Sequence, residues 1–155
     1  MVENAWRFRD YVIDSYNVDR PFDTFVLEQI AGDLLPYESD EQRNRQLVAT
    51  GFLELGPTNY ERQDKELLRM EVVDEQIETV GRAFLGMTLG CARCHDHKFD
   101  PVPADDYYAL AGIFRSTQSL VPGNVSGWVA REREPEPTQK KAIERHTGET
   151  RDCLL

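Results

Sequence analysis

Apolar residues recur every three or four positions over much of the chain, the spacing that places side chains on one face of an α-helix. The first such stripe predicts a helix over about 3–16. It would bury Trp6, Val12, Ile13 and Tyr16. A turn over 17–21 ends in Pro21, which suits the first turn of a second helix because its missing N–H needs no partner there. That helix continues to Pro36 and would bury Phe22, Phe25, Val26, Ile30 and Leu34.

The same period predicts helices in the middle of the chain. One spans about 40–55, is stopped by Gly56-Pro57, and would bury Leu47, Val48, Phe52 and Leu55. A longer one begins near 62 and carries on one face Leu67, Met70, Val73, Ile77, Val80, Phe84 and Leu85. After the turn at 99–103, a last helix spans about 104–116.

Beyond residue 116 the pattern fades into an irregular stretch with a short strand near 125–129. The sequence therefore predicts a mainly α fold, an irregular bundle of about five helices followed by a loop-rich C-terminal tail. We expect a helical domain over 1–118 and an irregular tail over 119–155 that begins a truncated segment.

Composition and charge narrow the function classes. The 155 residues are 40% hydrophobic and 30% charged, which is typical of one globular core. A formal net charge of -10 repels phosphate backbones, so we expect no nucleic-acid partner. No stretch reaches the roughly 20 apolar residues that a membrane-spanning helix needs. The N-terminal residues show no signal peptide.

The segment between the last two predicted helices reads Cys91-Ala92-Arg93-Cys94-His95, the pattern of covalent c-type haem attachment. In this pattern the two thiols add to the two haem vinyl groups, and the adjacent imidazole gives the iron an axial nitrogen. We therefore expect Cys91 and Cys94 to anchor haem c and His95 to bind its iron. This chemistry favours a non-catalytic redox carrier that shuttles electrons over an enzyme.

Two other chemistries fit the same residues. A redox dithiol would use Cys91 and Cys94, although no strand–helix–strand pattern surrounds them. A haem-free structural or interaction module would instead hold zinc, which needs four ligands. Its candidates are Cys91 and Cys94, with two further ligands from His95, His97, Asp100 and His146.

The sixth iron ligand stays open at this point. His97 follows His95 too closely to reach the opposite haem face, so we expect it to make a second hydrogen-bonding shell, or to bind zinc in the alternative. His146 is far enough along the chain to fold over the haem. Met87 lies too near the attachment point, and Met70 lies a long helix earlier. A five-coordinate iron would permit ligand binding.

Several blocks of the sequence resemble one family. The most specific block is Phe84–Pro101, which contains the Cys-x-x-Cys-His motif. The others are Trp6–Ile13, Arg20–Asp23, Gln29–Pro36, Ala49–Phe52 and Asp106–Phe114. Together they resemble the domain of unknown function 1549, found in large secreted planctomycete proteins beside a planctomycete cytochrome c domain. The likeness covers Trp6 to Gln118 and is that of a partial domain.

Because haem is attached to such motifs outside the cytoplasm, we expect an export signal upstream of Met1 in a longer precursor. The resemblance likewise implies an exported, multidomain protein with a periplasmic or extracellular location. It implies a link to extracellular electron transfer or, alternatively, an accessory role in polysaccharide utilisation; no enzymatic activity is established for the family. The expected partner is a redox protein or a neighbouring cytochrome domain.

Overall fold

The computed structural model describes residues 5–131, 133 and 135. Its α-helices are α1 (Ala5–Asn17), α2 (Phe22–Ala31), α3 (Asp40–Ala49), α4 (Lys65–Val80) and α5 (Ala104–Arg115). The 3₁₀ turns are η1 (Gly32–Leu34), η2 (Thr50–Glu54) and η4 (Leu89–Arg93), and η3 (Gly81–Leu85) is a π turn. Strands β1 (Leu120–Val121) and β2 (Gly127–Trp128) pair antiparallel. The prediction of a mainly helical fold is confirmed.

Side-chain caps and changes of helix type set boundaries that differ from the predicted ones. The helix predicted over 40–55 is α-helical only to Ala49 and then tightens into η2. The helix predicted from 62 begins at Lys65, because the Asp64 carboxylate accepts the Leu67 N–H at 3.0 Å and caps it. Past Val80 the α-helix widens into η3, which ends at Gly86 with φ of 67°. The left-handed conformation there suits a residue without Cβ.

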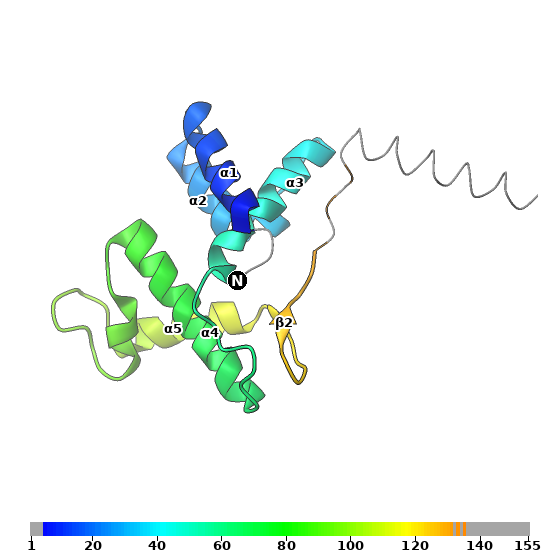
Figure 1. Ribbon diagram of the computed structural model, residues 1–155. Helices are drawn as coiled ribbons and strands as arrows, with labels where there is room; N and C mark the ends of the chain where they lie inside the picture. The colour runs from blue at the N-terminus through cyan, green and yellow to red at the C-terminus, as the bar shows by residue number, and fades with distance from the viewer. Residues whose placement is uncertain (1–4, 132, 134, 136–155) are drawn as a thin grey trace, which may run out of the picture.

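The helices form two groups in Figure 1, with α1, α2 and α3 in one and α4 and α5 in the other. η2 joins them through aromatic rings. The ring of Phe52 lies 6.0 Å from that of Phe8 in α1 and 5.1 Å from that of Phe84 in η3. These separations are within the range of favourable aromatic pairs. The two helix groups therefore contact each other through the Phe52 ring of η2.

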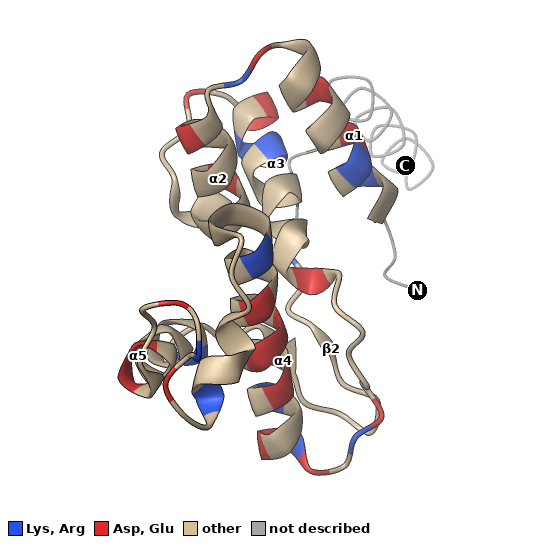
Figure 2. Ribbon diagram, turned by 90° about the vertical axis from the view of Figure 1, so that its left-hand side faces the viewer, with Lys and Arg blue, Asp and Glu red and all other residues tan. Residues whose placement is uncertain are grey.

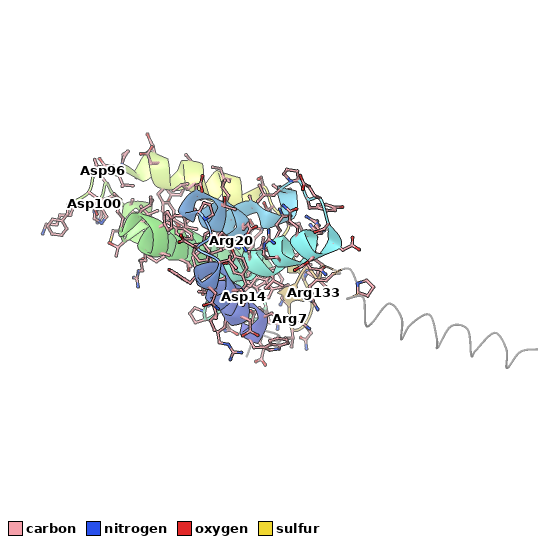
Figure 3. The ribbon with its side chains drawn as sticks, turned by 90° about the horizontal axis from the view of Figure 1, so that it is seen from above. Arg7, Asp14, Arg20, Asp96, Asp100 and Arg133 are labelled. Atoms are coloured by element: carbon pink, nitrogen blue, oxygen red, sulfur yellow. The ribbon has the colours of Figure 1, made fainter. Side chains whose placement is uncertain are left out.

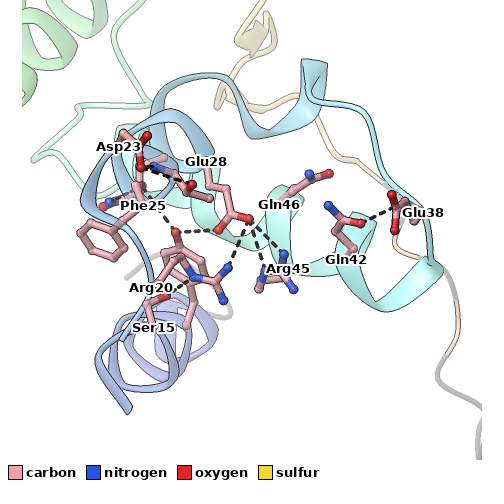
Figure 4. Close-up of polar contacts among 12 residues, drawn as sticks. Ser15, Arg20, Asp23, Phe25, Glu28, Glu38, Gln42, Arg45 and Gln46 are labelled. Atoms are coloured by element: carbon pink, nitrogen blue, oxygen red, sulfur yellow. Dashed lines mark hydrogen bonds and ion pairs between the residues drawn. The ribbon is translucent and has the colours of Figure 1, made fainter. Parts of the chain in front are cut away.

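The first group is centred on a carboxylate, Glu28, which is only 1% exposed (Figure 4). Its oxygens accept a hydrogen bond from the Tyr11 hydroxyl at 3.0 Å and one from the Arg45 guanidinium at 3.1 Å. The Arg20 guanidinium lies 3.6 Å away. A buried carboxylate is tolerated when it is paired and hydrogen-bonded in this way. This polar cluster therefore ties α2 to α1 and α3.

Most of the residues predicted to be buried on the first two helices are exposed, whereas Val12, Phe25 and Val26 are partly buried. Trp6, Ile13 and Tyr16 are 50%, 50% and 77% exposed, while α1 turns Tyr11 and Ser15 inward. In α2 the buried residues are Glu28 and Gln29. Exposed instead are the predicted core residues Phe22, Ile30 and Leu34. The physical reason is that both helices point polar cluster residues inward, which leaves part of each apolar stripe exposed. The Phe25 ring still stacks on the Tyr11 ring, with centroids 5.8 Å apart.

The second group has an apolar core between α4, α5 and η4. It consists of Val73, Ile77, Leu89, Ala92, Tyr107 and Ala111. The prediction that α4 buries Val73 and Ile77 is confirmed, whereas Leu67 and Leu85 are exposed. Gly81 allows the close approach of η4, since a Cβ there would lie 2.7 Å from Leu89 Cγ. The core thus presses η4 against the end of α4.

The start of the tail packs on the loop before α4. The predicted strand near 125–129 is present as β2, and it pairs with β1, which the sequence did not predict. The Trp128 indole N–H donates to the Tyr60 hydroxyl at 2.6 Å, and the Ser126 N–H donates to the Tyr60 carbonyl at 2.8 Å. The division at residue 118 stays a prediction. Within the described residues, no helix has the length and apolar character needed to cross a bilayer.

Candidate functional site

The Cys-x-x-Cys-His motif lies on η4 and the loop after it, beside α4 and α5. In a 3₁₀ helix, with three residues per turn, side chains at positions i and i+3 eclipse each other. Leu89 and Ala92 share the buried face, and Ala92 is 0% exposed. Gly90 and Arg93 share the face whose contacts reach α4. By the same three-residue repeat, Cys91 and Cys94 share the third face.

Both cysteines are free thiols and both are exposed. Cys91 Sγ lies 3.8 Å from the Thr88 hydroxyl oxygen. Cys94 is the residue that closes η4, with φ of −107° and ψ of −27°. Both cysteines therefore lie at the protein surface, whereas Ala92 between them is buried.

His95 is exposed, and its ring Nδ1 lies 2.7 Å from the Asp96 carbonyl oxygen. A carbonyl oxygen only accepts hydrogen bonds, so the ring proton is on Nδ1. In the neutral imidazole with this tautomer, Nε2 carries the free lone pair. This is the state of a metal-binding histidine whose other ring nitrogen donates to a backbone carbonyl.

His97 has the opposite tautomer and lies inside the loop. Its Nδ1 accepts the N–H groups of Phe99 at 3.2 Å and Asp100 at 2.8 Å, so the proton is on Nε2. Nε2 lies 3.3 Å from the Thr88 hydroxyl oxygen. With its side chain only 6% exposed, His97 holds the loop together. Both ring nitrogens are thus engaged within the protein.

The loop is also tied to α5. The Asp96 carboxylate accepts the Ala104 N–H at 3.0 Å, at the first residue of α5. Such a contact satisfies one of the N–H groups that a helix start leaves unpaired, and the helix dipole favours the negative charge. Figure 3 shows Asp96 and Asp100 in this loop at one end of the molecule, far from Arg7 and Arg133. The loop is therefore held at Thr88 and at α5.

The predicted zinc ligands that the structure describes do not gather into one site. Among residues 5–131, 133 and 135, no three His, Cys, Asp or Glu side chains gather to hold a metal ion. His146 lies outside the described residues, so its role as sixth iron ligand stays a prediction. Met87 is partly buried and packs against the core of the second group.

Two carboxylates of α4 contact η4, and the sequence analysis missed both. Glu78 Oε2 accepts the Gly90 N–H at 2.8 Å. Asp74 uses one oxygen to pair with the Arg93 guanidinium and the other to accept the Tyr107 hydroxyl. The spacing of 74 and 78 places both carboxylates on one helix face, which the sequence could have indicated. Which turn they meet depends on the tertiary fold.

Tyr107 gives a prediction for alkaline pH. Burial, followed by the hydrogen bond to Asp74 and the charge of Asp74, raises the pKa of the Tyr107 hydroxyl above its ordinary value of 10.0. The folded state then holds this proton more tightly than the unfolded state. Stability from this group is complete below pH 10.0 and is lost as the pH rises further. We expect the free energy of unfolding, measured by urea titration, to fall above that pH.

Tyr107→Phe is the matched variant for this titration, because it removes only the ionisable hydroxyl. The free energy of unfolding of this variant should fall less steeply with rising pH than that of the wild type. The residual slope comes partly from Tyr11, whose pKa is raised by burial, by the charge of Glu28 and by its hydrogen bond to Glu28. Equal slopes for wild type and variant would contradict the prediction.

Two cavities lie beside these elements. One of about 600 Å³ is lined by parts of α1, η2 and β2, and burial raises the pKa of Glu54 in its wall. The other, of about 480 Å³, lies on the α4 side of η4 and is lined in part by Asp74, Glu78, Gly90 and Arg93. Neither is lined by Cys91, Cys94 or His95. A group bound to the exposed thiols would lie outside these two cavities.

Comparison with known proteins identifies a family. The family model described as a protein of unknown function, DUF1549, matches residues 1–119. No curated protein and no solved structure was found to be similar to the chain.

Proposed function

Since the chain belongs to the DUF1549 family of proteins of unknown function, we propose a function from its own residues: it is a covalent haem-binding, electron-transferring domain of an exported protein. Cys91 and Cys94 anchor haem c, and His95 Nε2 binds the iron. The single observation that carries this proposal is the arrangement of η4, which buries Ala92 and leaves both thiols exposed one 3₁₀ turn apart.

The attachment chemistry needs no further reactant besides reduced haem. Each thiol S–H adds across the C=C bond of one vinyl group. A carbon–sulfur bond forms, the π bond breaks, and the thiol hydrogen passes to the other vinyl carbon. The addition is redox-neutral, and it requires free thiols, which is the state of both cysteines. Once bound, the haem iron supplies one-electron chemistry.

The residues around the thiols fit a porphyrin on the solvent side. His95 donates from Nδ1 to the Asp96 carbonyl, so Nε2 is the nitrogen free to bind iron. Phe99 is 83% exposed and Tyr108 is 56% exposed, and both lie next to the motif. The Tyr108 hydroxyl donates to the Arg93 carbonyl at 2.9 Å, which places its ring beside η4. The Tyr108 ring would offer apolar surface to a porphyrin beside η4.

Location and partner follow from this function. Haem is attached to such motifs outside the cytoplasm, so the proposed location is periplasmic or extracellular. The proposed partner is a redox protein or a neighbouring cytochrome domain. With a net charge of -10, the chain should favour a basic partner and a weak, salt-sensitive encounter.

The test is expression of the full chain behind an export signal, in cells with haem-attachment machinery. We expect haem to stay with the polypeptide after denaturation and the intact mass to rise by one haem. Cys91→Ala and Cys94→Ala should each lose one thioether bond and retain much less haem. His95→Ala should change the haem absorption spectrum through loss of the axial nitrogen.

Cys153→Ala is the matched control, because it removes a cysteine outside the motif. It should retain haem as the wild type does. A colourless wild-type chain of unmodified mass would overturn the proposal, and stoichiometric zinc in that chain would favour the zinc alternative.

A further inference from the structure

We infer that Asp74 and Glu78 of α4 are positioning residues for haem attachment, forming a clamp that holds η4 so that both thiols face one porphyrin edge. The term clamp denotes these two carboxylates and their contacts to Gly90 and Arg93. This inference rests on the proposed function and names residues that act through the turn and do not touch the haem.

The first contact fixes the start of the turn. Glu78 Oε2 accepts the Gly90 N–H at 2.8 Å, and Gly90 immediately precedes Cys91. A Cβ on Gly90 would lie 3.1 Å from the same oxygen, so glycine allows this close approach. A carboxylate bonded to a backbone N–H is among the stronger hydrogen bonds in proteins. The backbone leading into the first thiol is thus held by α4.

The second contact fixes the end of the turn. Asp74 pairs with the guanidinium of Arg93, which immediately precedes Cys94. Its other oxygen accepts the hydroxyl of Tyr107, which is 1% exposed and belongs to α5. Asp74 is therefore fixed by the core on one side and holds η4 with the other. The backbone leading into the second thiol is held by the same helix.

The two contacts act on one face of η4 and so control its rotation. Asp74 and Glu78 are four residues apart, which places both on the same side of α4. Gly90 and Arg93 are three residues apart, which places both on the same side of a 3₁₀ turn. Figure 2 shows acidic positions following one another along α4. Because one contact holds each end of η4, losing either lets the turn unwind and moves one thiol off the side that the two now share.

The experiment compares Glu78→Ala and Asp74→Ala with the wild-type chain under haem-attaching expression. We expect both variants to carry several-fold less haem joined by two thioether bonds. The haemochrome spectrum in pyridine reads how many vinyl groups remain unreacted, so it separates single from double attachment. Thermal unfolding of the haem-free chains checks that the helices remain folded.

Matched variants separate the clamp from simple loss of charge. Glu78 also pairs with Arg82 at 2.6 Å, so Arg82→Ala removes that ion pair and keeps the Gly90 contact. Glu75→Ala removes a neighbouring carboxylate that accepts the Thr58 hydroxyl instead. Both should attach haem as the wild type does. Glu78→Gln keeps an oxygen acceptor for Gly90 and should rescue double attachment.

A second readout does not need haem. Dibromobimane bridges two nearby thiols, and its reaction with the reduced haem-free chain measures whether Cys91 and Cys94 share one edge. Bridging should be slower in Glu78→Ala and Asp74→Ala and unchanged in Arg82→Ala and Glu75→Ala. If the wild type binds no haem, the proposed function fails, and bridging still decides on the clamp. Equal bridging and equal double attachment in all variants would overturn the inference.

Discussion

Glu28→Ala should destabilise the protein by about 3 kcal/mol, at the lower end of the cost of removing one partner from a buried ion pair. The substitution leaves the hydroxyl of Tyr11 and the guanidinium groups of Arg20 and Arg45 without their shared acceptor. The lower end applies because Arg45 is 32% exposed and can be solvated in part. Urea unfolding followed by circular dichroism measures the change.

Two variants make this result specific. Glu28→Gln keeps an oxygen acceptor for Tyr11 and loses only the charge, so it should lie between wild type and Glu28→Ala. Glu61→Ala removes an exposed carboxylate and should change stability by less than about 0.5 kcal/mol. A Glu28→Ala chain as stable as Glu61→Ala would show that the buried cluster does not hold the first helix group together.

Ile77→Ala should cost about 2–5 kcal/mol, the range for truncating a fully buried aliphatic side chain. Ile77 is 0% exposed and lies in the core with Leu89 and Ala92, the residues on the buried face of η4. The substitution leaves a cavity beneath the turn in addition to the lost burial. Denaturant unfolding gives the free-energy change.

The matched control is Ile113→Ala on α5, where the side chain is 64% exposed. This substitution should change the free energy of unfolding by less than about 0.5 kcal/mol. If the two isoleucine variants were equally stable, the core would not lie where α4, α5 and η4 meet.

Sequence periodicity predicted that helices exist but not which faces they bury. The α1 stripe of Trp6, Ile13 and Tyr16 has helical spacing, which is why the helix itself was correctly predicted. The buried face of α1 was predicted wrongly because Tyr11 points inward to donate to Glu28 of α2, beside the Arg20 guanidinium. Periodicity measures each segment by itself and does not detect a polar cluster assembled from several segments.

The candidate site was predictable to the extent that its chemistry is local. Cys91, Cys94 and His95 lie within five residues, so their spacing alone predicts haem attachment, which stays a prediction. The roles of Asp74 and Glu78 depend on contacts made 12 to 19 residues later in the chain. The His97 hydrogen bonds depend on how the loop closes on Thr88. Those features require the three-dimensional arrangement.

The three-residue repeat of η4 also restricts how far apart the cysteines can stand in this framework. One added or deleted residue between them would rotate the second sulfur by about a third of a revolution relative to the first. After an insertion the sulfur would point into the apolar core beside Ala92, and after a deletion it would point toward Glu78 of α4. An insertion of three residues, one full 3₁₀ turn, would bring the second sulfur back to the same side. The angle between the two side chains, and not only the distance between them, therefore limits the spacing.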